Sequence, residues 1–409
     1  MPEQIREVRA LWGTAFNKAF TAASAAGWHP ATAHKLAVTS VDLTKLIMKG
    51  IPSKVRQSRF SGHPSPIIGP TRSELALGMY LGKGSATTSP PLEATIASLV
   101  FGGLQSPPTA KVDAAESTTT TTSIKASAHG ALPGMAVLCG VPGDARGNGE
   151  VRRIASVTTD TVVLEMATMA ALEAADPIVF SHTVYLLPTA TQNYIDLLCL
   201  GYHLEDQIQA LGCMGPLSFS GLGVGEVPEM ILNLVVPDWQ EVPAAARDQL
   251  EPYHAPEGEA DAPAGRSVGG FFMGDWGVTT RAVVESDDWS IDPGIAFNDI
   301  KDRSGLNGIG GFTHVPAVAK AGLKVYIDED YGLHADWSSK TAKQLLWQLG
   351  NTAANCVAFT MPRAIMPNKP VRVSIGDMAG LKLDFEAQEP TVADVADGLY
   401  SSSFAIHWF

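Results

Sequence analysis

The chain has 409 residues and a net charge of −13; 45% of its residues are hydrophobic and only 17% are charged. This length gives room for two or three domains with cores of their own, and the sparse charge suggests a surface largely covered by other protein copies. No Lys/Arg-rich patch suggests binding of nucleic acid through its phosphates. No apolar run reaches the roughly 18 residues of a membrane span, and residues 1–4 begin no secretory signal, so we expect folding in a cytoplasm.

The first hundred residues predict strands followed by one helix. Residues 1–30 are expected to be an N-terminal lead-in or an arm that packs on a neighbouring copy. Apolar side chains stand at every second position from Leu75 to Leu81, which is the period of a strand with one buried face. Ser89-Pro90 then predicts the start of a helix, and Gly102-Gly103 predicts its end.

Residues 105–190 are expected to be an insertion that folds as a small β-barrel. A threonine run opens the segment, and short strand-like runs follow at 134–139, 150–157 and 161–166, separated by turns. An appended barrel more often decorates a surface than performs chemistry. We therefore expect that 105–190 can be deleted and closed with a short linker without loss of the larger fold.

The second half begins with residues 241–268, whose Pro, Ala, Gly and Glu content predicts an extended linker. Residues 241–300 hold twelve acidic and three basic residues. The stretch 292–312, with Gly305, Gly308, Gly310 and Gly311, predicts a long loop with a function. The tail 388–409 ends in alternating apolar residues, and we expect it to dock on the protein.

Residues 338–387 predict a second helix and a hairpin. Ser338 is a plausible N-cap, and Gly350-Asn351 is a C-cap signal. Apolar residues stand between them at helical spacing, namely Ala342, Leu345, Leu346 and Leu349. Two alternating runs follow, at 371–375 and 381–387, so that Val371, Val373 and Ile375 are expected on one face with Arg372 and Ser374 on the other.

The order of strand, helix and hairpin occurs twice, which predicts a tandem duplication. Leu75 matches Leu323 at a shift of 248, and residues 36–40 match 282–286 at 246. After the helix, residues 216–219 match 370–373 at 154, and 232–234 match 383–385 at 151. The step between these shifts places an insertion in the first copy, after its helix.

No group of residues points to catalysis or to a bound cofactor. Gly221–Gly225 joins two strands rather than a strand and a helix, and Gly305–Gly311 lacks the Lys-Ser/Thr of a phosphate loop. The histidines are scattered, and no G-x-S-x-G or H-E-x-x-H motif is present. The four cysteines have no CxxC spacing and are expected to be buried thiols; they are Cys139, Cys199, Cys213 and Cys356. We therefore expect no catalytic, cofactor-binding or metal-binding residues, and no enzyme.

Five short runs, taken in order, resemble the major tail tube protein of long-tailed, siphovirus-like bacteriophages. The first half contributes RALWGT at Arg9–Thr14 and LALGMYLG at Leu75–Gly82. The second half contributes Gln348–Asn351, Met361–Ala364 and Gly380–Gln388, which closes on a polar alternating strand. The resemblance covers roughly three quarters of the chain and lies in the order of these runs.

Proteins of that family stack as rings around a channel through which the viral genome passes. Most have one tube domain per chain and form hexameric rings; some have two and form trimeric rings with pseudo-six-fold symmetry, and this chain looks like the second kind. The resemblance implies a mainly β (α+β) fold with two tandem β-sandwich or barrel tube modules, each with one packed helix. It also implies a place in the virion tail, assembly in the host cytoplasm, and contacts with tape measure, terminator and distal tail proteins.

The shifts and the resemblance together divide the chain. The first tube module is 1–104 with 191–240, followed by the inserted domain 105–190, the linker 241–268 and the second module 269–409. The polar strand faces would line the channel, where an acidic or mixed lining repels phosphate, so DNA passes without specific binding. The candidate lumen-facing residues are Glu74, Tyr80, Tyr326, Asp328, Lys382, Asp384 and Glu386.

Two other classes of function stay open. A baseplate or distal-tail adaptor, or a secretion-system tube, would form one ring per particle or part of a cellular machine. A carbohydrate-acting β-sandwich enzyme would need a cleft lined by convergent carboxylates or histidines.

Overall fold

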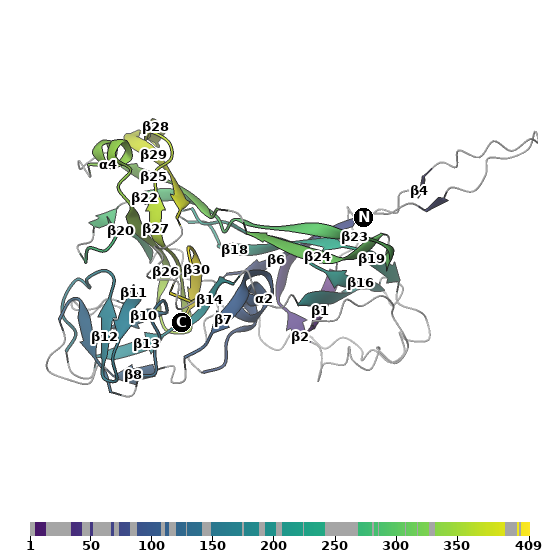
Figure 1. Ribbon diagram of the computed structural model, residues 1–409, viewed down its shortest axis with the longest axis horizontal. Helices are drawn as coiled ribbons and strands as arrows, with labels where there is room; N and C mark the ends of the chain where they lie inside the picture. Colours follow the sequence, from purple (N-terminus) through teal and green to yellow (C-terminus); the bar gives the residue numbers. More distant parts are fainter. Residues whose placement is uncertain are drawn as a thin grey trace, which may run out of the picture.

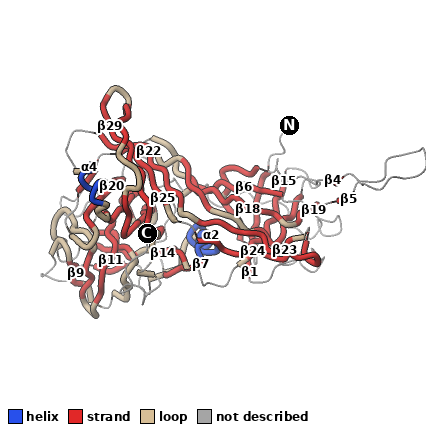
Figure 2. Tube along the Cα trace, turned by 45° about the horizontal axis from the view of Figure 1, so that its top comes forward, coloured by secondary structure: helices blue, strands red, loops and turns tan. Residues whose placement is uncertain are grey.

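The computed structural model is an elongated molecule in which antiparallel sheets lie side by side along the long axis (Figure 1). The described residues contain two α-helices, α2 (Leu92–Phe101) and α4 (Leu333–Ser339), and otherwise mainly strands, which confirms the mainly β class (Figure 2). The structure describes residues 5–13, 34–42, 50–51, 67–68, 73–81, 88–107, 111–113, 120–127, 129–140, 149–173, 176–187, 193–201, 207–223, 225–241, 269–279, 282–284, 286–306, 308–316, 318–326, 332–388, 399–400 and 402–409. The predicted linker 241–268 lies outside them except at residue 241.

A first set of strands comes from the chain on both sides of α2. They are β1 (Ile5–Gly13), β2 (His34–Leu36), β3 (Val38–Asp42), β4 (Gly50–Ile51), β5 (Ile67–Ile68), β6 (Ser73–Tyr80), β15 (Tyr194–Gly201), β16 (Gln207–Cys213), β17 (Leu217–Ser220), β18 (Glu229–Val236) and β19 (Asp238–Glu241). They form a five-stranded sheet, β19-β16-β15-β1-β2, a four-stranded sheet, β17-β18-β6-β3, and the hairpin β4-β5.

A second set of strands follows in the same order. They are β20 (Gly269–Asp275), β21 (Ala282–Val284), β22 (Ser286–Asp292), β23 (Ile295–Leu306), β24 (Ile309–Pro316), β25 (Lys320–Tyr326), β26 (Lys343–Thr352), β27 (Asn355–Ile365), β28 (Val371–Ile375), β29 (Met378–Ala387) and β30 (Ala405–Trp408). The pairings β30-β27-β26-β20-β21 follow those of β19-β16-β15-β1-β2, and β28-β29-β25-β22 follow β17-β18-β6-β3. The hairpin β23-β24 takes the place of β4-β5, and α4 that of α2.

A separate antiparallel sheet forms between these two sets in the sequence. Its strands are β8 (Lys111–Asp113), β9 (Ser123–Lys125), β10 (Ala136–Cys139), β11 (Glu150–Val157), β12 (Thr161–Leu164) and β13 (Pro177–Phe180), in the order β8-β13-β10-β11-β12-β9. They agree with the strand-like runs predicted in this segment. The hydrogen-bonded order of the described strands is open at β8 and β9, whereas a small barrel was predicted.

The inserted sheet packs on the second set of strands, and its flanking strands lie in the large sheet. Gln348 of β26 accepts a hydrogen bond from the Val151 amide and donates one to the Gly149 carbonyl, and the Arg152 guanidinium lies 4.4 Å from the Phe272 ring centroid. The two parts share one apolar cluster: Ala136, Leu138, Val151, Met166, Val179, Phe272, Leu346, Cys356, Ala358 and Phe409. β7 (Gly102–Gln105) lies at the border of the predicted insertion 105–190, and β14 (His182–Leu186) lies inside it. The two strands pair with each other in the large sheet.

The helix predicted after Ser89-Pro90 is confirmed as α2. Pro91 is its N-cap, and Gly102 ends it in the left-handed conformation at φ 89°, where a side chain would be strained. Six of its ten residues are buried: Ala94, Ile96, Ala97, Leu99, Val100 and Phe101.

The helix predicted from Ser338 to Gly350 is wrong, because α4 ends at Ser339 and β26 begins at Lys343. Leu345 and Trp347 of β26 face the main core, while Leu346 faces the inserted sheet. A strand that is buried on both faces loses the period-two pattern, and its leucines then imitate helical spacing.

Two other segments also differ from their predictions. Residues 5–13 are a paired strand, β1, between β15 and β2, rather than a lead-in or an arm. Residues 292–312 are not a loop but most of the hairpin β23-β24, with paired backbone from Ile295 to Pro316. The hairpin β28-β29 is confirmed.

β28 has no single buried face: Val371, Arg372 and Ser374 are all exposed, and Ile375 at its end is buried. Val371 pairs with Lys382 and is 57% exposed. Arg372 pairs with Leu381, as Phe219 of β17 pairs with Met230 of β18. The predicted match between these strands is therefore one residue out of register, and a slip of one residue moves every side chain to the other face.

The predicted docking of the C-terminal tail is confirmed. β30 pairs with β14 on one side and with β27 on the other. The Phe404 ring before it stacks on Phe101 of α2, with ring centroids 5.9 Å apart, and lies 6.3 Å from the Phe359 ring of β27. Four apolar side chains of the tail are fully buried: Phe404, Ile406, Trp408 and Phe409.

Truncation of Phe404 tests the importance of this junction. We expect Phe404→Ala to lower the free energy of unfolding by about 3–5 kcal/mol, because it leaves a cavity between α2 and β27. Val371→Ala, at an exposed position, is the matched control and should change stability by less than about 0.5 kcal/mol. Urea unfolding followed by tryptophan fluorescence gives both free energies of unfolding. Equal losses in the two variants would contradict the importance of Phe404 at the junction of α2 and β27.

Deletion of the insertion tests its boundaries. Removing 105–190 also removes β14, the partner of β30, so we expect this variant not to fold. Removing 108–180 and joining the ends with a short Gly/Ser turn keeps β7 paired with β14. We expect the second variant to fold but to self-associate through its uncovered apolar face, and Leu346→Thr to reduce that association. Soluble yield measures the folding of each deletion variant, and size-exclusion chromatography measures its self-association. Equal folding of both deletions would show that β14 is dispensable.

Candidate functional site

The outer face of the four-stranded sheet is the first candidate surface. Along β6, Leu75 and Leu77 are at most 1% exposed, while Glu74 and Tyr80 lie on the opposite face. The strand β18 continues this outer face, with Val235 directly opposite Glu74. The period of two residues thus separates an apolar core face from a polar outer face.

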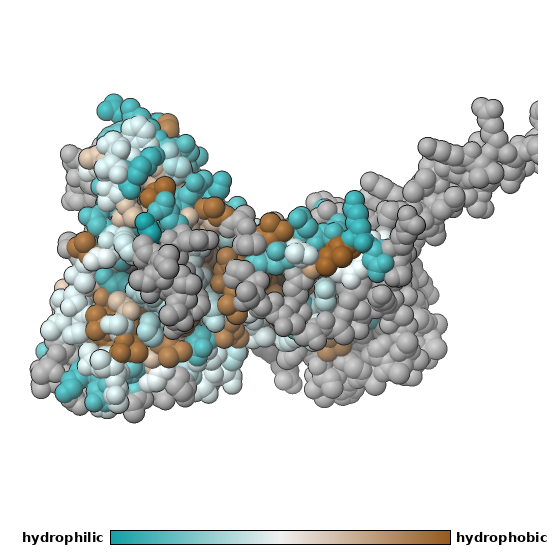
Figure 3. All heavy atoms as spheres, in the orientation of Figure 1, coloured by the Kyte–Doolittle hydropathy of each residue, from teal (hydrophilic) through white to brown (hydrophobic). Residues whose placement is uncertain are grey.

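The equivalent face of β25 and β29 has more charges. Leu323 and Leu383 are fully buried, and charged residues alternate with them. Three ion pairs lie on the outer face: Lys320–Glu386 at 3.3 Å, Lys324–Asp288 at 2.5 Å and Lys382–Asp384 at 3.8 Å. Such solvated pairs contribute about 0–1 kcal/mol each, so they matter for the charge of the surface more than for stability. Hydrophilic side chains dominate the end of the molecule that carries β28 and β29 (Figure 3).

Six of the seven residues predicted to face a channel are described, and they lie on these two outer faces. They are Glu74 and Tyr80 in β6, Tyr326 in β25, and Lys382, Asp384 and Glu386 in β29. The structure brings the three β29 residues together, whereas the β6 residues lie in the neighbouring sheet. Asp328 lies outside the described residues.

The two sheets meet edge to edge within the chain. The edge strand β17 of the first sheet contacts the edge strand β22 of the second. Among the described strands, β17 is hydrogen-bonded only to β18 and β22 only to β25, so side chains make this contact. The Phe219 ring of β17 reaches across and meets the Phe359 ring edge-on, with centroids 4.9 Å apart.

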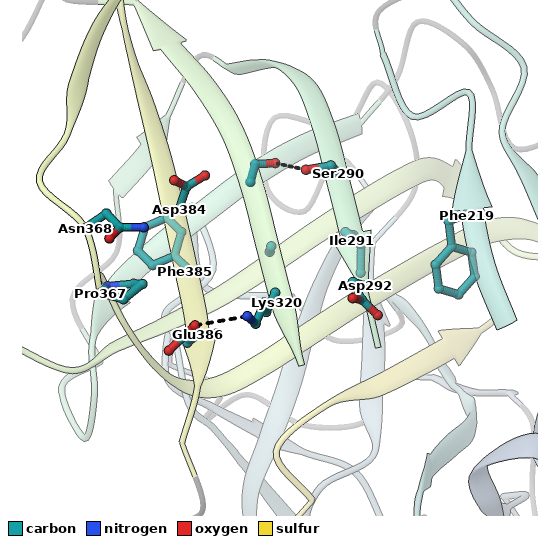
Figure 4. A pocket seen from close by; sticks show the side chains of 12 residues that line it. Phe219, Ser290, Ile291, Asp292, Lys320, Pro367, Asn368, Asp384, Phe385 and Glu386 are labelled. Atoms are coloured by element: carbon teal, nitrogen blue, oxygen red, sulfur yellow. Dashed lines mark hydrogen bonds and ion pairs between the residues drawn. The ribbon is translucent and has the colours of Figure 1, made fainter. Parts of the chain in front are cut away.

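A pocket of about 380 Å³ opens at this junction (Figure 4). Phe219 borders it from one side and the strands β22, β25 and β29 from the other. Three carboxylates and one ammonium group line it: Asp292, Asp384, Glu386 and Lys320. The Asp292 carboxylate accepts a hydrogen bond from the Gly294 amide at 2.9 Å. The lining thus has an excess of negative charge, and it suits a basic ligand.

The hairpin β23-β24 covers part of the outer face of the first set. Ile309 and Phe312 of β24 form a cluster with Met214 and Val235, and the Tyr194 ring lies 6.4 Å from the Phe312 ring. A Cβ atom at Gly311 would lie 3.0 Å from the Tyr194 hydroxyl, so the glycine permits the close approach. Figure 1 shows the hairpin running from the second set across the first. The prediction of a loop concealed this contact, and the only weak signal for it was the pair of apolar residues, Ile309 and Phe312, on either side of Gly310-Gly311.

A buried hydrogen-bond network joins β14, β27 and β30. The His407 ring bonds through Nδ1 to the Thr183 hydroxyl at 3.0 Å and through Nε2 to the Thr360 hydroxyl at 2.9 Å. Ser181 lies 3.4 Å from Nδ1. A serine beside a histidine can form a nucleophile–base pair, but Ser181 and His407 are both 0% exposed. A substrate has no access to them, and the network is structural.

Cysteines and possible metal ligands are two further kinds of reactive group among the described residues. The four cysteines are free and buried, as predicted, and burial raises the pKa of the Cys139 and Cys199 thiols to about 12, which keeps them protonated and inert. Within the described part of the chain, no three His, Cys, Asp or Glu residues are placed to hold a metal ion. No described helix is long and apolar enough to cross a membrane.

Comparisons of the sequence with protein-family models and with curated proteins find no match. The strand pairings and the chemistry of the two outer faces are therefore the features of this chain that bear on its function.

Burial of His407 makes stability depend on pH. Burial, and secondarily the positive charge of Arg153, lower the pKa of His407 well below its ordinary value near 6.5. The unfolded chain therefore binds a proton that the folded chain does not, as pH falls below about 6.5. We expect the free energy of unfolding to fall by up to about 1.4 kcal/mol per pH unit there because of His407, and the dependence to be weaker in His407→Gln. Urea titrations from pH 7.5 to 5 measure both slopes; equal slopes would contradict the assignment.

Proposed function

We propose that this protein is the structural subunit of a bacteriophage tail tube, in which rings stack around the channel that carries the genome. The observation that supports the proposal most strongly is the recurrence of one pairing scheme along the chain. β2-β1-β15-β16-β19 and β21-β20-β26-β27-β30 have the same order, as do β3-β6-β18-β17 and β22-β25-β29-β28. A helix stands at the same place in each series.

This recurrence supports two tandem tube modules, residues 1–104 with 191–240 and residues 269–409, with an outward domain inserted in the first. The strand register supports a shift of 246 between β6 and β25, which matches Leu77 with Leu323, rather than the predicted 248. Leu77 pairs with Leu232 and Leu323 pairs with Leu383, and Leu232 and Leu383 are themselves matched at the shift of 151. The pairing β7-β14 closes the base of the insertion.

The contact of β17 with β22 supports ring closure. It sets the two four-stranded sheets edge to edge in the order β3-β6-β18-β17, then β22-β25-β29-β28. Among the described strands, β3 pairs only with β6 and β28 only with β29, so an edge remains at each end. Placing β28 of one chain beside β3 of the next repeats the contact, and three chains bring six sheets into a closed ring without a free edge.

The outer faces of β6, β25 and β29 would line the channel. Glu74 repels phosphate, while Lys382 stands beside Asp384 at 3.8 Å and is neutralised by it. A mixed lining without a basic patch lets DNA pass without release of bound counterions, which is the source of strong nonspecific binding. The subunit itself performs no turnover; its partners are further copies and the other tail proteins, in the virion.

Electron microscopy of the native assembly without imposed symmetry tests this proposal. We expect long stacks of rings with an open channel, three chains in each ring and six similar sheets around the channel. Rings of six chains would contradict the three-chain ring, but they would still agree with the proposal of a tail tube. Single rings at the end of a particle would favour an adaptor, and a monomer under all conditions would overturn both.

A further inference from the structure

The chain shows once how a hairpin of one strand set docks on the other set. Met214 and Val235 form an isolated bridge at the ends of β16 and β18, and Ile309 and Phe312 of the hairpin β23-β24 pack on it. Val235 is 5% exposed for this reason, although it lies on the outer face that exposes Asn233.

In the second set, no described hairpin packs on the corresponding position, where Glu386 contacts Lys320 of the neighbouring strand. The shift of 151 that relates Leu232 to Leu383 takes Val235 to Glu386 and Met214 to Ile365. Ile365 and Glu386 are themselves a pair between β27 and β29, which is the same bridge. Here the outer side chain is a carboxylate, 36% exposed, at the edge of the acidic pocket. The position that is apolar in the first set is acidic in the second.

The hairpin that corresponds to β23-β24 is β4-β5, and its surroundings in the sequence are basic. Residues 43–72 contain six basic residues and no acidic one: Lys45, Lys49, Lys54, Arg56, Arg59 and Arg72. Figures 1 and 2 both place β4 at the end of the molecule remote from β28 and β29. The pocket of the same chain is therefore out of reach of β4-β5 in this structure.

We propose that the hairpin β4-β5 and its basic flanks, residues 43–72, dock in the acidic pocket at Asp384 and Glu386 of a second copy of the chain. This inference rests on the proposed ring, in which the second strand set of one chain precedes the first set of the next. Each hairpin then covers the set before it: β23-β24 within the chain, through apolar side chains, and β4-β5 between chains, through charge pairs. The change of side-chain chemistry at the two equivalent positions distinguishes the two contacts.

Charge reversal on each side tests the docking. One variant is Asp384→Lys with Glu386→Lys; the other is Lys54→Glu with Arg56→Glu and Arg59→Glu. We expect each variant to raise the protein concentration at which rings form, in 50 mM NaCl, by about tenfold or more, as the loss of about 1.4 kcal/mol or more requires. The chain that carries both sets of changes should form rings within about threefold of the wild-type concentration. Asp160→Lys, in the exposed turn between β11 and β12, is the matched control.

The outcomes separate this inference from the ring itself. If both charge-reversed variants form rings at the wild-type concentration and with the wild-type salt dependence, the docking is wrong while the ring stands. Carbodiimide crosslinking of a mixture of isotopically heavy and light chains provides a readout that needs no rings. Crosslinks between lysines of 43–72 in one chain and Asp384 or Glu386 of the other support the docking, even if only pairs of chains form. Crosslinks confined to single chains, or none at these carboxylates, overturn it.

Discussion

The C-terminal strand β30 is the constraint on which the rest of the structure depends. It lies between β14 and β27, so the last residues of the chain complete a sheet to which the middle and the second half both contribute. Phe404 and Trp408 bring large apolar side chains into a core that includes α2. Because a central strand must be hydrogen-bonded on both edges, this sheet forms only when segments more than 200 residues apart have met.

The inserted sheet is also held in place by contacts with distant parts of the chain. The face of the inserted sheet that packs on β20, β26 and β27 is apolar. The buried charges of the sheet are paired: Arg152 with Glu150 at 2.6 Å, and Arg153 with Glu165. Arg153 also donates to the Tyr400 carbonyl, at the start of the segment that leads to β30. Removing one partner of a buried ion pair costs several kcal/mol. The insertion is thus part of the folded core of the second strand set, although the sequence attaches it to the first.

The two strand sets show how one backbone scheme supports two surfaces. Backbone pairing sets which side chains face outward, and it does so equally at Val235 and at Glu386. The side chains then decide what those positions contact. Val235 accepts the apolar hairpin β23-β24, whereas Glu386 keeps Lys320 at 3.3 Å and stays at the surface. Differences of this kind between equivalent positions are what allow a duplicated scheme to have distinct contacts within a chain and between chains.

Local patterns in the sequence determined the elements that have one buried face or a clear end signal. The alternation of Leu75, Leu77 and Met79 defined β6, and Ser89-Pro90 with Gly102-Gly103 bounded α2. The polar outer faces followed from the same alternation, and so did the general position of the candidate residues. Tertiary structure alone decided β26, because its burial on both faces removes the period that marks a strand. It also decided the register of β28, the covering of Val235 and the pocket beside Glu386, because these depend on which distant segments meet, and short-range periodicity contains no information about that.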